Sequence, residues 1–148
     1  MRLDGGRLFP GWIFCTGLMI CGGCGGKSDA PSAVTVYEVK GSVLLADGKP
    51  LSGGHVYLVP KEGLVAPEGA IKPDGTFTVA TSGSGEGAPP GEYKVRLEPA
   101  DATLLSGKKT VSAGKKLPFS AKYLDEDTSG LTTIVKAEPN TLEPFRLK

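Results

Sequence analysis

The sequence predicts an all-β fold, a single antiparallel β-sandwich of about seven strands. Short apolar runs rich in valine and threonine alternate with polar side chains, which is typical of half-buried strands. The 22 glycines and 12 prolines fall mostly between these runs, where they mark turns. No stretch after the N-terminal leader shows the period of a long amphipathic helix.

The N-terminal leader, residues 1–23, has the layout of an export signal. Arg2 and Arg7 precede an uncharged apolar run over residues 8–20, and small residues follow. A membrane-spanning helix needs about 20 apolar residues, and this run is shorter and contains Pro10. We therefore expect a cleaved signal, with a retained anchor as the alternative.

The chain's 3 cysteines, Cys15, Cys21 and Cys24, lie in or directly after this leader. Cys24 follows two glycines, and a small residue before a cysteine resembles the bacterial lipobox. The sequence departs from the lipobox pattern at Cys21, where leucine is usual. The resemblance implies removal of residues 1–23 and a lipid on Cys24, while the rest of the chain has no thiol that would need an oxidising compartment.

Two other interpretations of the leader stay open. Residues 30–33 offer a loose Ala-x-Ala cleavage site, which would give a freely secreted protein. The Cys21-x-x-Cys24 spacing also occurs in zinc and redox sites, but only His55 follows it as a further zinc ligand of the usual nitrogen or sulfur kind. Residues 24–33 are small and polar, so we expect a flexible tether before a domain at 34–148.

The first part of the domain predicts two strands around an Asp47-Gly48 turn. In the second strand, Val56 and Leu58 would face one side and His55 and Tyr57 the other. Residues 69–82 predict a hairpin with a Pro-Asp-Gly turn, and residues 89–99 predict another half-buried strand. The side chains expected on the buried faces of these two segments are Phe77, Val79, Tyr93, Val95 and Leu97.

The second part of the domain is less regular. Residues 100–123 show little periodicity and predict a long crossover between the sheets, with a short strand near 109–112. The last segment, from residue 130 onward, predicts two further strands around a Pro139-Asn140 turn.

Three of these stretches, "GSVLLADGKPLSGGHVYLVP", "PDGTFTV" and "PPGEYKVRL", together resemble the carboxypeptidase regulatory-like domain. That domain is a transthyretin-like, Ig-like sandwich. The closing segment resembles the C-terminal part of small lipoproteins of planctomycete type that carry it. The resemblance covers most of residues 36–147. Because its motifs mark turns and core positions, it implies the fold more strongly than the function.

An acidic segment, residues 125–130, matches the opening of a calcium loop. Asp125, Asp127 and Ser129 have the ligand spacing, but the position that needs a bidentate glutamate holds Lys136. We expect a solvated loop without a metal, and weak calcium binding is the alternative.

The remaining candidate residues also have ordinary structural interpretations. His55, the one histidine and therefore the required base of any Ser-His-Asp triad, is expected on the outward face beside the turn residue Ser52. Lys40 and Asn140 match a Lys–Asn crosslink of related surface sandwiches, but asparagine is also common in turns. Tyrosines that could face outward and bind a sugar are Tyr37, Tyr57 and Tyr123.

These observations predict a non-catalytic cell-envelope lipoprotein that presents the sandwich as a structural or interaction module. The N-terminal lipid would hold it at the outer membrane or the periplasmic face, where an envelope protein or a glycan is a possible partner. The alternative is a secreted or surface module that binds glycan or peptide through loops such as residues 83–89 or 100–116. Basic and acidic side chains balance in residues 24–148, which argues against nucleic acid, and no cofactor is expected.

Overall fold

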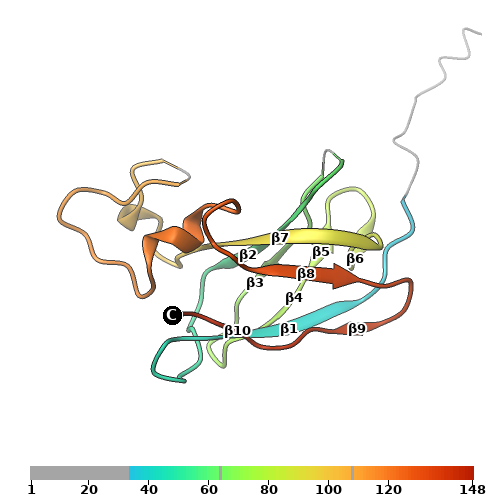
Figure 1. Cartoon of the computed structure of the whole chain (residues 1–148), viewed down its shortest axis with the longest axis horizontal. Coiled ribbons are helices and arrows are strands. Elements are labelled where there is room, and N and C mark those ends of the chain that lie inside the picture. Colours follow the sequence, from blue (N-terminus) through green and yellow to red (C-terminus); the bar gives the residue numbers. More distant parts are fainter. Residues whose placement is uncertain (1–33, 64, 108) are drawn as a thin grey trace, which may run out of the picture.

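Two β-sheets pack face to face in the computed structural model, which describes residues 34–63, 65–107 and 109–148 (Figure 1). The predicted all-β sandwich is confirmed. The predicted signal, Cys24 and the tether lie outside the described residues. None of the helices in the described part of the chain is long and apolar enough to cross a membrane.

The larger sheet has 6 strands in the order β6-β5-β3-β2-β7-β8, and all neighbouring strands in it are antiparallel. Its centre is the long pair of β2 and β7, in which Val56 and Leu58 are buried and His55 is exposed, as the alternation predicts. The bounds are β2 His55–Pro60, β3 Glu68–Ala70, β5 Ala80–Thr81, β6 Gly85–Glu86, β7 Gly91–Glu98 and β8 Thr132–Val135.

The smaller sheet is built around β1 (Val39–Leu44). β4 (Thr76–Thr78) pairs with one edge of β1 in antiparallel orientation. β9 (Asn140–Thr141) and β10 (Phe145–Arg146) both pair with β1 in parallel orientation. The sandwich is therefore mainly but not wholly antiparallel, because the last segment of the chain returns beside the first strand.

The described residues form 10 strand segments, more than the predicted number, because two strands are interrupted and the short β6 lies where no strand was predicted. β4 and β5 are one stretch of chain that leaves the smaller sheet for the larger one at Val79, whose N–H donates to Val39 O (3.2 Å). β9 and β10 are separated by residues 142–144, where Pro144 has no N–H to donate.

Three connections differ from the sequence-based expectation. The Asp47-Gly48 turn exists, but it leads only to a bridge between Pro50 and Leu44. It does not pair β1 with β2, because these two strands lie in different sheets. The crossover holds two 3-10 helices, η1 (Ala102–Leu104) and η2 (Ala121–Leu124), and one Leu105–Val111 bridge instead of a strand at 109–112. Asn140 is the first residue of β9 and not a turn residue.

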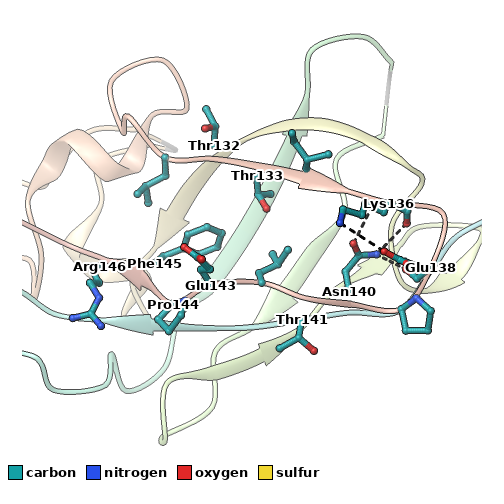
Figure 2. A pocket seen from close by; sticks show the side chains of 14 residues that line it. Thr132, Thr133, Lys136, Glu138, Asn140, Thr141, Glu143, Pro144, Phe145 and Arg146 are labelled. Carbon is teal, nitrogen blue, oxygen red and sulfur yellow. Dashed lines mark hydrogen bonds and ion pairs between the residues drawn. The ribbon is translucent and has the colours of Figure 1, made fainter.

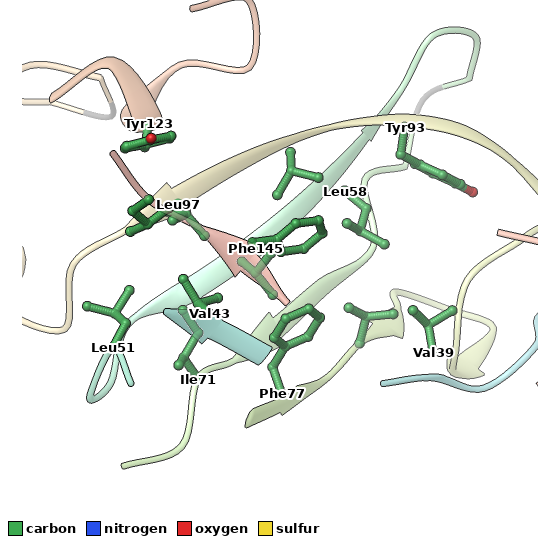
Figure 3. Packing of buried hydrophobic residues seen from close by; sticks show 14 of the residues in the cluster. Val39, Val43, Leu51, Leu58, Ile71, Phe77, Tyr93, Leu97, Tyr123 and Phe145 are labelled. Carbon is green, nitrogen blue, oxygen red and sulfur yellow. The ribbon is translucent and has the colours of Figure 1, made fainter. Parts of the chain in front are cut away.

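One apolar core lies between the sheets (Figure 3). The predicted inward positions are confirmed, since Phe77, Val79, Tyr93, Val95 and Leu97 are all buried. The crossover closes one end of the core by adding side chains from η2 and its approach: Phe119, Tyr123 and Leu124. This packed core positions the strand edges and the outer faces of the two sheets.

Candidate functional site

The acidic segment 125–130 is an ion-paired turn. Asp125 Oδ1 accepts a hydrogen bond from Asp127 N (2.8 Å), and Asp125 Oδ2 lies 2.9 Å from Lys109 Nζ. Asp127 Oδ1 accepts from Lys94 Nζ (2.7 Å). Ser129 is buried, and its hydroxyl accepts from Leu131 N (3.2 Å). The three side chains considered as weak calcium ligands are therefore near one another in the chain but bound to protein groups.

The lysines set the electrostatics of this turn. The hydrogen bond from Lys109 holds the pKa of Asp125 below its usual range, and the same contact raises the pKa of Lys109. Asp127 likewise raises the pKa of Lys94. Across residues 34–63, 65–107 and 109–148, no group of three or more His, Cys, Asp and Glu side chains is arranged to hold a metal. Calcium would have to displace ammonium groups to reach these carboxylates.

A half-buried polar cluster lies on the outer face of the central β2–β7 pair. Arg96 Cζ lies 3.8 Å from the centre of the Tyr57 ring, and Arg96 Nη1 is 2.6 Å from Glu98 Oε1. The Tyr57 hydroxyl donates to Glu98 Oε2 (3.1 Å). Burial, followed by the charge of Glu98, raises the pKa of Tyr57 to about 12. The exposed His55 lies at the border of this cluster, with its ring centroid 6.4 Å from that of Tyr57.

The tyrosines do not form the open aromatic face that a sugar would need. Arg96 already occupies one face of the Tyr57 ring. Tyr123, considered above as a tyrosine that could face outward, is buried, and its hydroxyl accepts from Lys148 N (2.7 Å). Tyr37 is half-buried and forms an isolated antiparallel backbone bridge with Ala88, two residues after the end of β6. Tyr123 is not part of an outward face because η2 turns its ring into the end of the core.

The two loops considered as ligand-binding loops have local structure. Residues 80–86 form the β5–β6 hairpin, in which Ser84 N donates to Thr81 O (3.0 Å). Residues 100–116, in their described part, are held by the Asp101 cap of η1, whose carboxylate accepts from Thr103 N (2.8 Å). The hairpin borders a cavity of about 550 Å³ whose polar lining side chains are Glu68, Thr81 and Ser82, and none of these three lies within residues 83–89 or 100–116.

Asn140 has a different role from the crosslink considered above. Its Oδ1 accepts from Lys136 N (2.9 Å), and its Nδ2 donates to Lys136 O (3.0 Å) and to Glu138 O. Lys40 instead pairs with Glu38 Oε1 (2.6 Å). The carboxamide of Asn140 thus binds both the N–H and the C=O of Lys136, as the backbone of a neighbouring strand would.

A groove of about 560 Å³, which Asn140 also lines, lies between β8 and the C-terminal segment, residues 138–146 (Figure 2). Thr132 and Thr133 of β8 both border the groove, and the side chain of Thr133 points toward the C-terminal segment (Figure 2). The groove is bordered by an edge of each sheet and lined by both charges and apolar side chains. Its main lining side chains are Thr133, Lys136, Asn140, Glu143, Phe145 and Arg146.

No family model, no curated protein and no solved structure matches this chain. The functional argument therefore depends on the geometry above and on the leader.

The sequence predicts a strand in this region, but it predicts neither the groove nor the position of β8 at the edge of a sheet. The run Thr-Thr-Ile-Val predicts a strand, but its place at the end of a sheet depends on which distant strands pair. The signal that could have indicated an open edge is that this run contains no lysine or proline, the residues that usually protect an edge strand.

Proposed function

We propose that the chain is a non-catalytic cell-envelope lipoprotein, held by a lipid on Cys24 and presenting its β-sandwich as an interaction module. The observation that carries the interaction role is the open side of the sandwich, where a groove of about 560 Å³ lies beside the edge strand β8. Grooves beside open strand edges are suited to contacts with another polypeptide.

The leader supports the anchored form. Cys24 precedes the first described residue, Val34, by a short segment that spans at most about 35 Å when extended. Val34, the residue that follows this segment, and Val65 are both exposed and line a cavity of about 550 Å³. The same cavity is also lined by Glu62 and by the ion-paired Lys61 and Glu92. This end of the domain therefore presents both apolar and charged side chains, as a domain held close to a membrane surface can.

The setting of His55 supports a non-catalytic role. The ring is exposed at the start of β2, and its aromatic neighbour Tyr57 directs its hydroxyl to Glu98 instead. A general base needs a nucleophile within hydrogen-bond reach and a third group that orients it. Among the described residues, we find no hydrogen bond between His55 and another side chain.

Membrane fractionation with mass analysis of the N-terminal peptide tests the proposal. The wild-type chain is expected in the membrane fraction with an acylated Cys24 as its first residue, and Cys24→Ser is expected to lose both properties. A wild-type chain that begins near Ala33 without a lipid would reject the anchor. Retention of Trp12 in the mature chain would reject signal cleavage.

Binding of a glycan or peptide is the second candidate function. The observation that favours it is the Arg96–Glu98 pair, which is half-buried on an outer sheet face and offers charged groups beside the Tyr57 ring. A glycan array with wild type and Arg96→Met separates this candidate from the first. Specific binding that Arg96→Met abolishes would favour the second candidate.

A further inference from the structure

The free edge of β8 exposes backbone groups at two residues. β8 is the last strand of the larger sheet in the described part of the chain. Val95 N donates to Leu131 O (2.9 Å), so residue 131 directs its peptide groups toward β7. In an antiparallel pair this direction alternates along the strand. The N–H and C=O groups of Thr132 and Ile134 therefore point away from β7, toward the free edge.

Asn140 limits the length of this free edge. The next position with outward-pointing groups is Lys136, and its N–H and C=O are both bound by the Asn140 carboxamide (2.9 and 3.0 Å). At the other end, Gly130 has a φ of 68°, where the chain leaves the extended conformation. The open part of the edge is thus confined to Thr132, Thr133 and Ile134.

The exposed part of β8 lacks the usual protection of edge strands. Natural sheets commonly place lysine, proline or a bulge on an edge, because free peptide groups recruit other strands. The C-terminal segment across the groove has Pro139 and Pro144, but β8 is Thr-Thr-Ile-Val. Ile134 is 61% exposed and is one of the most exposed large apolar side chains in the described residues.

We propose that β8 pairs in antiparallel orientation with β8 of a second copy of this chain, so that the two larger sheets join into one. This inference rests on the interaction role proposed above and names the partner. In the register that places Thr133 opposite Thr133 of the second copy, Thr132 pairs with the second copy's Ile134, and Ile134 with its Thr132. All free N–H and C=O groups of the edge are then satisfied.

The Thr133 register has two neighbours. The carboxamide of Asn140 excludes one of them, and Gly130 excludes the other, because the register with Thr132 opposite itself would pair Ile134 with Gly130 of the second copy, whose φ is 68°. The register with Ile134 opposite itself would pair Thr132 with Lys136 of the second copy, whose peptide groups are already bound. In the selected register, the residue opposite Lys136 is Gly130 of the second copy, where the chain turns away. The short open edge is therefore self-complementary, which an isologous two-fold interface requires.

The contact is small, because β8 has 4 residues. Stable interfaces usually bury about 800 Å² on each partner. We therefore expect a weak dimer in dilute solution that forms when two copies are held on one membrane, where tethering raises the effective concentration.

A cysteine crosslink in the full exported chain tests the pairing, because the described residues contain no cysteine. Thr133→Cys places two thiols in a facing pair without hydrogen bonds, with a Cα–Cα distance of about 4.5 Å. This distance lies within the range that disulfides accept, about 4.4–6.8 Å. Mild oxidation of membranes is expected to link most of the Thr133→Cys chains into dimers. Thr103→Cys, in the exposed η1, is expected to link no more than wild type.

A second variant separates edge pairing from chance collision. The Ile134 N–H points away from β7, so Ile134→Pro removes a free donor without removing a β7–β8 hydrogen bond. The Thr133→Cys/Ile134→Pro chain is expected to fold with unchanged melting temperature within a few degrees and to lose the crosslink. A crosslink that survives Ile134→Pro would overturn the proposal, and so would crosslinking through Ile134→Cys but not through Thr133→Cys.

The N-terminal mass of the same sample separates failure of the pairing from failure of the lipid anchor. A chain with acylated Cys24 that does not crosslink through Thr133→Cys overturns the pairing alone. A chain without the lipid that still crosslinks at high concentration rejects the anchor and supports the pairing. Capture of an unrelated peptide by the β8 edge without self-crosslinking would also overturn the proposal.

Discussion

Phe77 and Phe145 stack across β1, with their ring centroids 6.0 Å apart and their planes 8° from parallel. They come from β4 and β10, which flank β1 on its two sides. Gly41 of β1 lies opposite Phe77, and a Cβ atom at Gly41 would be 2.5 Å from Phe77 Cζ. Because Gly41 has no side chain, the Phe77 ring can lie directly over the middle of β1.

Gly41→Ala is expected to lower the free energy of unfolding by about 1–3 kcal/mol, the usual cost of overpacking a core. Gly41 does not have a positive φ, so an alanine there would not strain the backbone, and the cost would come from the contact with the Phe77 ring. Urea unfolding measures the change. Phe77→Leu removes the outer ring atoms, so Gly41→Ala should cost less in that background. An equal cost in both backgrounds would contradict the packing argument.

The raised pKa of Tyr57 predicts a loss of stability in alkali. Burial and Glu98 raise this pKa to about 12, whereas an unfolded tyrosine titrates at about 10. The folded state holds the proton more tightly, so the stability is complete below about pH 10 and is lost as the pH rises toward about 12. Wild type should lose more free energy of unfolding across this window than Tyr57→Phe. Urea unfolding at fixed ionic strength measures the free energy of unfolding at each pH. The prediction would be rejected if this free energy fell equally with pH in wild type and in Tyr57→Phe.

Much of the fold could be predicted because the signals are local. The alternation of Tyr93, Val95 and Leu97 identifies a strand with one buried face, and the Pro73-Asp74-Gly75 turn defines a hairpin without reference to distant residues. The parallel pairing of β1 with β9 and β10 could not be predicted in this way. It depends on contacts between the two ends of the domain.

The candidate site was harder to predict for the same reason. The Asp-x-Asp-x-Ser pattern suggests calcium, but the lysines that neutralise it come from β7 and the crossover. Asn140 lies only four residues from Lys136, but asparagine is also common in turns. That this local contact closes a sheet edge follows only from the position of β8 at the end of the larger sheet. A sequence shows which side chains are present, while ion pairs and edge contacts depend on tertiary placement.

Calcium is expected to leave the melting temperature of the wild-type chain unchanged at millimolar concentration. The carboxylates of Asp125 and Asp127 are occupied by Lys109 and Lys94. A ligand at a hundred times its dissociation constant would add about 2.7 kcal/mol of stability, which thermal unfolding detects readily. Magnesium at the same ionic strength is the control. A shift with calcium alone in wild type would show that the cation displaces the lysines.

The Asn140 carboxamide predicts a local pattern of hydrogen exchange. Asn140→Ala removes the acceptor of the Lys136 N–H, so exchange at this amide should accelerate toward that of an exposed residue, with a global loss of about 1 kcal/mol. Val135, whose peptide groups face Gly91 of β7, should keep its protection. Thr141→Ala changes the neighbouring exposed residue of β9 without touching this contact and serves as the control. Unchanged exchange at Lys136 in Asn140→Ala would mean that the carboxamide does not close this end of the β8 edge.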